Sequence, residues 1–246
     1  TTDKTTRHTV SKMKKYRIDF LCRTIINFEF EYDNIQMKTL LIFFLLLIAV
    51  GLRILAQHSS IHVDEAYSYV FYGSQNWLTA LGMYNLPNNH FLNTFFIKLF
   101  AIFFGPGVFS LRLGGFLFGL ALAVPVFLFW NKLFGFATGF LASFLTSSYF
   151  GIVEYSSLAR GYIYQVFFFW MSLYLALKIR QSSTTKLWIL FSFSLLLSIY
   201  AVPTGIYAIG IPILFLLLQK LNPLNRKQGF KILALVLGLG GSILFF

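Results

Sequence analysis

Long apolar runs separated by short polar or basic segments dominate this chain of 246 residues. A helix that crosses a membrane needs about 20 mostly apolar residues, and the runs approach that length. Pro203 and Gly205 interrupt the longest run and divide it into a helical hairpin, because both residues disfavour a continuous helix. The candidate spans are residues 39–56, 108–130, 134–152, 163–179, 187–201, 203–218 and 232–246. The pattern predicts an all-α, polytopic bundle of about seven transmembrane helices.

The apolar segment 91–104 fits this pattern less well, because it is short, carries Lys98 and ends at Gly105-Pro106-Gly107. It either spans the membrane or lies on its surface as an amphipathic helix. Cytoplasmic loops carry an excess of Lys and Arg. If 91–104 spans, every later loop changes side and the basic clusters fall outside. We therefore favour a surface helix within a long first outer loop, which is too aromatic to be disordered.

In the favoured arrangement the basic residues gather on the cytoplasmic side. The inside loops hold Lys132, Lys178, Arg180, Lys186, Lys220, Arg226, Lys227 and Lys231. The outside receives Arg53, Lys98, Arg112 and Arg160. We expect a multi-pass protein of the plasma (inner) membrane with a cytoplasmic N-terminus.

The first 36 residues differ from the rest, with seven Lys or Arg, five of the eight acidic residues and no long apolar run. They lack the layout of a cleavable signal peptide, and Met37 followed by Lys38 looks like a natural start. We expect residues 1–36 to be a cytoplasmic tail or not native, and residues 37–246 to form one transmembrane domain. The last run reaches Phe246 without a polar exit, which predicts truncation at the C-terminus.

Composition supports a membrane protein over a soluble one. Charged residues make up 11% of the chain and hydrophobic residues 57%, whereas soluble domains carry about 25% charged residues. The net charge of +12 does not indicate a nucleic-acid partner, because the basic residues lie between apolar runs instead of on one face. The single cysteine, Cys22, excludes an intramolecular disulfide.

Carboxylates are rare after the tail, where the acidic residues are Asp64, Glu65 and Glu154, all on the expected outer side. Acidic residues beside lipid are costly and usually functional, and a partly dehydrated carboxylate is a better base. An alternative is that Asp64 and Glu65 cap a helix beginning near Ala66. His62 together with Asp64 is a weak signal for a metal site.

Two further polar segments fall on the same expected side. In YNLPNNHFLNTFF, Asn88, Asn89 and His90 offer donors and acceptors for sugar hydroxyls or phosphate oxygens, or else they cap a helix. In EYSSLARGY, which contains Glu154 and Tyr155, Arg160 suits phosphate recognition. The alternative is a snorkelling arginine among interfacial tyrosines.

The order of these motifs resembles the catalytic N-terminal half of a GT-C glycosyltransferase. The similar group is the protein O-mannosyltransferase-like one, with bacterial lipid A aminoarabinose transferases and rhizobial lipopolysaccharide transferases. The resemblance covers about 100 residues and rests on HVDEAY at 62–67, NNHFL at 88–92, FFGPGVFSLRL at 103–113, NKLFG at 131–135 and YSSLARGY at 155–162.

The resemblance implies transfer of a sugar from a polyprenyl-phosphate donor to a glycan, lipid or protein acceptor on the outer face of the membrane. The family motifs map onto Asp64 and Glu65, onto Asn88, Asn89 and His90, and onto Arg160, Gly161 and Tyr162. Many relatives carry an acidic residue two positions after the arginine, where this chain has Tyr162. Glu154 is the candidate that would replace it.

The implied mechanism has Asp64 as general base on the acceptor hydroxyl and Glu65 positioning Asp64 or the acceptor, with inversion at the sugar. Arg160, helped by His90, Lys98 or Arg112, would neutralise the departing phosphate. We expect no cofactor and do not favour a divalent metal. The competing hypotheses are a transporter or flippase for a lipid-linked sugar, which needs broken helices at mid-membrane depth, and a non-catalytic membrane fragment.

Overall fold

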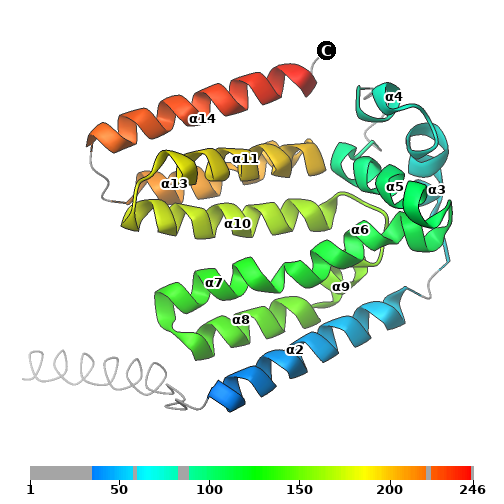
Figure 1. Cartoon of the computed structure of the whole chain (residues 1–246), viewed down its shortest axis with the longest axis horizontal. Helices are drawn as coiled ribbons and strands as arrows, with labels where there is room; N and C mark the ends of the chain where they lie inside the picture. The colour runs from blue at the N-terminus through cyan, green and yellow to red at the C-terminus, as the bar shows by residue number, and fades with distance from the viewer. Residues whose placement is uncertain (1–34, 58–59, 83–88, 220–222, 245–246) are drawn as a thin grey trace, which may run out of the picture.

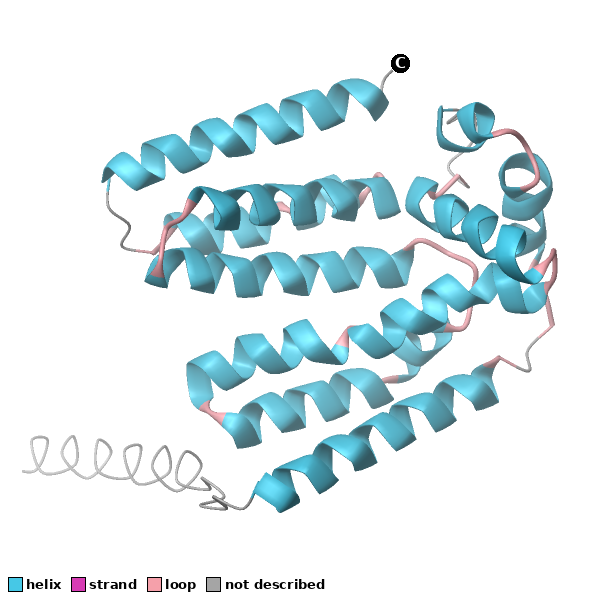
Figure 2. Ribbon diagram, viewed as in Figure 1, coloured by secondary structure: helices cyan, strands magenta, loops and turns pink. Residues whose placement is uncertain are grey.

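The computed structural model describes residues 35–57, 60–82, 89–219 and 223–244 (Figure 1). Every regular element in these ranges is a helix, as the sequence predicts (Figure 2). Within the described residues, three helices are long and apolar enough to cross a membrane: Gln36–Ala56, Val108–Phe134 and Tyr162–Gln181. A fourth span results if the bent pair Phe136–Ser148 and Phe150–Ser156 counts as one.

The long helices lie side by side and reverse direction from one to the next as far as α11; α13 then returns, so that α14 runs in the same direction as α11 (Figure 1). They are α2 (Ile35–Ala56), α6 (Val108–Ala121) with α7 (Ala123–Phe134), α8 (Phe136–Ser148), α10 (Tyr162–Gln181), α11 (Thr185–Ala201) and α14 (Pro223–Leu244). The connections from α7 to α8 and from α10 to α11 are short, whereas shorter helices occupy the chain between α2 and α6 and between α11 and α14. Gly135 joins α7 to α8 with a φ of 90°, a conformation that residues with a side chain rarely adopt.

Aromatic and aliphatic side chains fill the spaces between these helices. One buried cluster centres on Trp188, Phe191 and Leu195 of α11, which pack against α10, α14 and α13 (Gly210–Leu217). A second cluster places Ile163 and Tyr164 of α10 against α6 and α7. Because these buried contacts are apolar and interdigitated, they fix the helices relative to one another.

Short helices cover one end of the bundle (Figure 1). They are α3 (Val63–Ser68), the π-helical turn η1 (Tyr69–Gly73), α4 (Trp77–Gly82) and α5 (Phe91–Phe104). With 14 residues, α5 extends about 21 Å, which is shorter than the hydrocarbon core of a bilayer at about 30 Å. It packs against α6, η1 and α4 at this end. The position of α5 at one end agrees with the arrangement in which 91–104 does not cross the bundle; its length does not decide this, because the apolar helix Gly205–Leu217 is shorter still.

The predicted span 134–152 is wrong as one continuous helix. The chain bends by 63° between α8 and α9 (Phe150–Ser156). Tyr149 has an extended backbone, with ψ at 127°, and therefore ends α8. The predicted span 203–218 corresponds to α12 (Gly205–Ala208) and α13, which Ile209, with a helical backbone, joins into one apolar helix, Gly205–Leu217.

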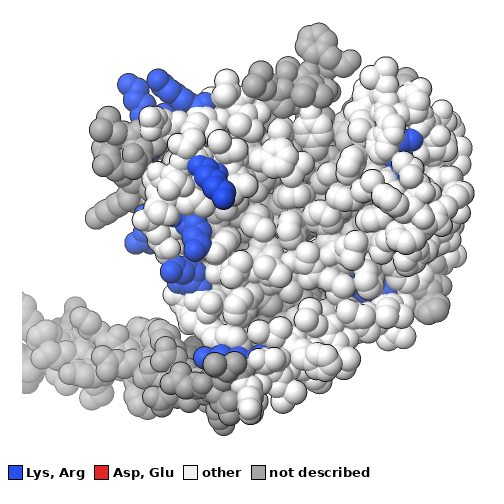
Figure 3. All heavy atoms as spheres, viewed as in Figure 1, with Lys and Arg blue, Asp and Glu red and all other residues white. Residues whose placement is uncertain are grey.

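The two ends of the bundle differ in charge. On the face drawn in Figure 3, Lys and Arg gather at the end where α7 meets α8 and α10 meets α11. Lys132 lies in the last turn of α7, and Lys178 and Arg180 lie in the last turn of α10. Asp64 and Glu65 lie in α3, at the opposite end.

Candidate active site

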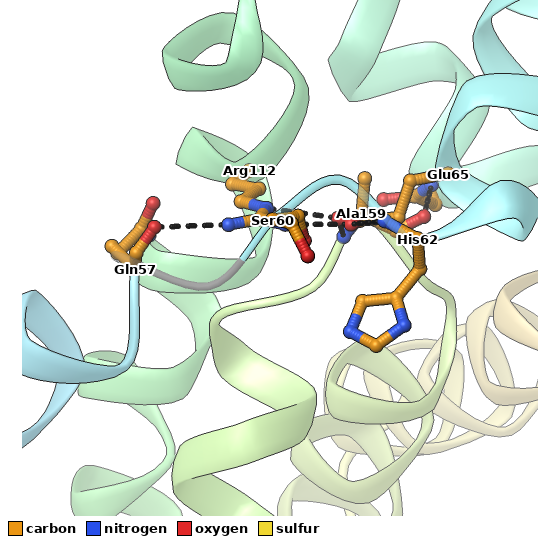
Figure 4. Close-up of polar contacts among 7 residues, drawn as sticks. Gln57, Ser60, His62, Glu65, Arg112 and Ala159 are labelled. Atoms are coloured by element: carbon orange, nitrogen blue, oxygen red, sulfur yellow. Dashed lines mark hydrogen bonds and ion pairs between the residues drawn. The ribbon is translucent and has the colours of Figure 1, made fainter.

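A buried ion pair joins α3 to α6. Arg112 is fully buried and Glu65 is 1% exposed. Nη2 of Arg112 lies 2.7 Å from Oε2 of Glu65, and its Nε lies 2.9 Å from Oε1 (Figure 4). This forked contact between two planar groups fixes their orientation as well as their distance. The pair therefore holds the start of α3 in one place on α6.

Backbone groups from three further segments complete the network around this pair (Figure 4). Arg112 donates to the carbonyls of Gln57 and Ser60, each at 3.0 Å. The amide of His62 donates to Oε2 of Glu65 at 3.0 Å, and the amide of Ala159 donates to Oε1 at 2.6 Å. One salt bridge consequently forms hydrogen bonds with three segments: the chain that follows α2, the start of α3 and the loop 157–161.

Glu65 is an anchor and is poorly suited to accept a proton. Burial acts to raise the pKa of Glu65, but the hydrogen bonds from Arg112, His62 and Ala159 outweigh it and hold that pKa below its usual value. The contact with the His62 amide is also a helix cap, so the capping interpretation applies to Glu65. The helix begins at Val63 instead of near Ala66, and its first turn contains both carboxylates.

Asp64 has the opposite environment to its neighbour. Its side chain is 60% exposed, and Oδ2 lies 3.4 Å from Nη1 of Arg160, whose side chain is 12% exposed. The Arg160 guanidinium also lies over the ring of Tyr162, 5.7 Å from its centroid. The structure therefore brings together an accessible carboxylate from α3, a guanidinium from the loop 157–161 and an aromatic ring from the start of α10.

The loop that carries Arg160 is held on both sides at Ala159. Its amide binds Glu65, and its carbonyl accepts a hydrogen bond of 2.8 Å from the amide nitrogen of Asn93 on α5. Asn93 is fully buried and also lies within 3.4 Å of the Tyr164 hydroxyl. Sequence reasoning missed Asn93 as a site residue, although an amide inside an apolar helix was a visible signal.

Asn89 and His90 precede α5, but they differ in role. Asn89 is fully buried, donates to the carbonyl of Ala80 at 3.1 Å and accepts from the Thr94 hydroxyl at 2.8 Å. These contacts attach α4 to the start of α5; neither of them caps a backbone amide of α5, whose N-cap residue is His90. Asn88, its predicted partner, lies outside the described residues.

His90 is 2% exposed, and its ring lies 5.4 Å from that of Tyr162. Among the described residues, neither ring nitrogen makes a hydrogen bond of normal geometry, although the carbonyl of Ala201 lies near enough to favour the charged form. Burial, and then the charge of Arg160, lower the pKa of His90 to about 4. A neutral imidazole with one donor and one acceptor therefore borders the Asp64–Arg160 pair.

The other predicted phosphate ligands are used elsewhere. The ammonium of Lys98 binds the carbonyls of Gly73 and Gln75 and lies 5.0 Å from the centroid of Trp77, so it ties α5 to η1. The donors of Arg112 are directed at Glu65 and backbone carbonyls, as described above. Glu154 is exposed on α9.

Within the described ranges, no group of three or more His, Cys, Asp or Glu residues is arranged to hold a metal ion. The weak metal signal from His62 and Asp64 thus gains no third ligand there. Comparisons with protein-family models, with curated proteins and with solved structures find no match to this chain.

Proposed function

We propose that this chain is a membrane glycosyltransferase of the GT-C type, which transfers a sugar from a polyprenyl-phosphate donor to an acceptor hydroxyl. The observation that carries the proposal is the exposed carboxylate of Asp64, 3.4 Å from Arg160 and adjacent to the buried anchor Glu65. A base and a phosphate ligand are the two groups that this reaction requires from the protein.

The proposed membrane arrangement has seven spans. They are α2, α6 with α7, α8 with α9, α10, α11, α12 with α13, and α14. The N-terminus and the basic end of the bundle face the cytoplasm, and the end with α3 to α5 faces outward at the plasma membrane. The separation of basic residues from the Asp64–Glu65 pair along the bundle supports this orientation.

In the proposed reaction, Asp64 accepts the proton of the acceptor hydroxyl while that oxygen bonds to the anomeric carbon. The bond between this carbon and the phosphate oxygen breaks, and the electron pair leaves with the polyprenyl phosphate. Arg160 stabilises the charge that develops on the phosphate. Attack and departure on opposite faces invert the anomeric centre.

The geometry of the pair suits this division of labour. Because the Asp64 carboxylate is open to solvent, its ion pair with the less exposed Arg160 contributes about 1 kcal/mol, and substrates can separate the two groups at little cost. The donor phosphate then binds the Arg160 guanidinium, and the acceptor hydroxyl donates a hydrogen bond to the Asp64 carboxylate. Tyr162, next to Arg160, offers a ring face to the sugar.

The test is transfer of radiolabelled sugar from polyprenyl-phosphate donors in membranes that contain the native protein or its Asp64→Asn variant at matched amounts. Loss of a general base should reduce the rate by about 100-fold or more. Lys186→Gln, an exposed change at the basic end, serves as control and should retain full activity. Equal rates for Asp64→Asn and the parent would remove Asp64 from the chemistry.

A transporter of lipid-linked sugars is the second candidate function. The 63° bend between α8 and α9 is the broken helix that such a function uses, although it lies beside the last turn of α2 and not at mid-membrane depth. Reconstituted vesicles separate the two functions. Movement of a labelled lipid-linked sugar between leaflets without transfer to any acceptor would support transport and contradict the transferase.

A further inference from the structure

Arg53, in the last turn of α2, is a fully buried cation that the proposed chemistry does not use. Its Nη1 donates to the carbonyls of Ala49 at 3.0 Å and Ser147 at 3.2 Å, and its Nη2 donates to the carbonyl of Gly119 at 3.0 Å. A charge buried among apolar helices is costly, so it persists where it has a function.

The contact with Ser147 lies at the bend between α8 and α9. The last carbonyls of a helix have no donor within that helix. Because Tyr149 ends α8, the carbonyl of Ser147 is one of these groups, and Arg53 supplies the missing donor from α2. Arg53 therefore stabilises the bent form of this span over a straight one.

Gly119 brings α9 to the same point. A Cβ atom at this position would overlap the side chain of Ser156 and would lie 2.8 Å from Nε of Arg53. One turn earlier on α6, a Cβ at Gly115 would lie 3.0 Å from the carbonyl oxygen of Leu158. One face of α6, which contains Gly115 and Gly119, consequently packs against Arg53, α9 and the beginning of the loop 157–161.

We infer that Arg53 is a positioning residue. By stabilising the bend between α8 and α9, it holds the loop 157–161 in the position that places Arg160 opposite Asp64. This inference rests on the proposed function. The path is continuous: Arg53 holds the carbonyls of Ser147 and Gly119, α9 follows the bend, and Ala159 then docks on Glu65. Arg53 acts on the site through α9 and the loop; its Nη1 and Nη2 bind backbone carbonyls, and its Nε has no hydrogen-bond partner among the described residues.

The test uses Arg53→Met, which removes the charge, and Arg53→Lys, which keeps the charge but lacks the fork that serves two carbonyls at once. A local readout is the maleimide labelling rate of Leu158→Cys, in a background where Cys22 is serine. Both Arg53 variants should label several times faster than the parent, because the loop is released. Gly119→Ala should act in the same direction, while Gly51→Ala, in α2 with open space around its Cβ, should label like the parent.

The functional readout is the split between KM and kcat. A displaced Arg160 should raise the donor KM and lower kcat by up to about 100-fold, the scale of a 1 Å misplacement. A simple loss of folded protein would lower the maximal rate and leave both KM values unchanged. If Arg53→Met does not accumulate in membranes, Arg53→Lys and Gly119→Ala decide the question.

Parental labelling rates in Arg53→Lys and Gly119→Ala, together with parental KM values, would overturn the inference. If the parent itself transfers no sugar, the proposed function fails. The labelling rates then still report whether Arg53 holds the loop.

Discussion

Asp64 and Glu65 are neighbours in sequence, yet their environments are opposite. Asp64 is 60% exposed beside Arg160, and Glu65 is buried under Arg112 and two backbone amides. Because successive residues in a helix point about 100° apart, one turn of α3 directs one carboxylate outward and the other inward. Substitutions of Asp64 should therefore affect mainly activity, and substitutions of Glu65 should affect mainly stability.

Glu65→Gln should destabilise the fold, because it leaves the Arg112 charge buried without a partner. Removing one member of a buried pair costs about 3–5 kcal/mol, whereas Asp64→Asn, at a carboxylate that is 60% exposed, should cost about 1 kcal/mol. Thermal unfolding in detergent compares the two. Similar small shifts in Tm for both variants would show that the buried pair does not hold α3.

A double variant, Glu65→Leu with Arg112→Met, provides the control for this interpretation. It removes both charges together, so neither is left uncompensated in the interior. We expect it to unfold at a higher temperature than Glu65→Gln, although its site should be disordered and inactive. A double variant less stable than the single one would contradict the role assigned to the pair.

The buried ring of His90 predicts a dependence of stability on pH. Burial lowers the pKa of His90 from 6.5 to about 4, so between these values the unfolded chain binds a proton that the folded chain does not. The free energy of unfolding should fall by up to about 3 kcal/mol as pH drops through this window. The lowered pKa of Glu65 adds a loss in the same direction, but only below its ordinary value of 4.5.

His90→Gln removes the first of these contributions. The Tm of the parent should decline between pH 6.5 and 4.5, and the Tm of the variant should be nearly constant across that interval. Parallel curves for the two proteins would mean that His90 is charged or solvated in the folded state.

The residue types of the site were visible in the sequence, but their partners were not. Asp64, Glu65, Arg160 and His90 stood out as polar side chains beside apolar runs. The pairing of each arginine with its carboxylate depends on how α3, α6 and the loop 157–161 pack. Arg112 is 47 residues from Glu65, so no local pattern reports that pair.

At the scale of elements, the bounds of the apolar runs predicted the bounds of some helices closely and of others poorly. The predicted spans 163–179 and 187–201 correspond to α10 and α11 within two residues at each end. The span 232–246 begins later than α14, which starts at Pro223 in a basic segment. A helix needs satisfied backbone groups and does not need apolar side chains throughout, and proline is favourable in its first turn.

The bend between α8 and α9 was not predicted from the run 134–152, which contains no proline and no charged residue, although Thr146, Ser147 and Ser148 stand directly before the bend. The donor that stabilises the interrupted helix end belongs to Arg53, which is 94 residues from Ser147. The sequence analysis placed Arg53 among the few basic residues outside the membrane and used it to orient the helices. Its burial depends on the glycine face of α6, which becomes apparent only when three helices are packed together.

At the scale of the whole molecule, the orientation of the bundle is the feature on which the proposed function depends. Basic residues lie at the α7–α8 and α10–α11 connections, and the Asp64–Arg160 pair lies at the opposite end. A lipid-linked donor would place its phosphate at one membrane surface. The site can meet that phosphate only if the helices between these ends cross the bilayer.

Helix α11 gives the sharpest test of this arrangement, because its 17 residues are few for a span. Thr184 and Thr204 flank it, both exposed, one at the basic end and one at the end of the site. In a background where Cys22 is serine, each is changed to cysteine and treated in intact cells with a membrane-impermeant maleimide. Thr204→Cys should be labelled and Thr184→Cys protected, and inside-out vesicles should give the reverse. Labelling of both from the same side would mean that α11 does not cross the membrane, and the seven-span arrangement, with its outward-facing site, would have to be abandoned.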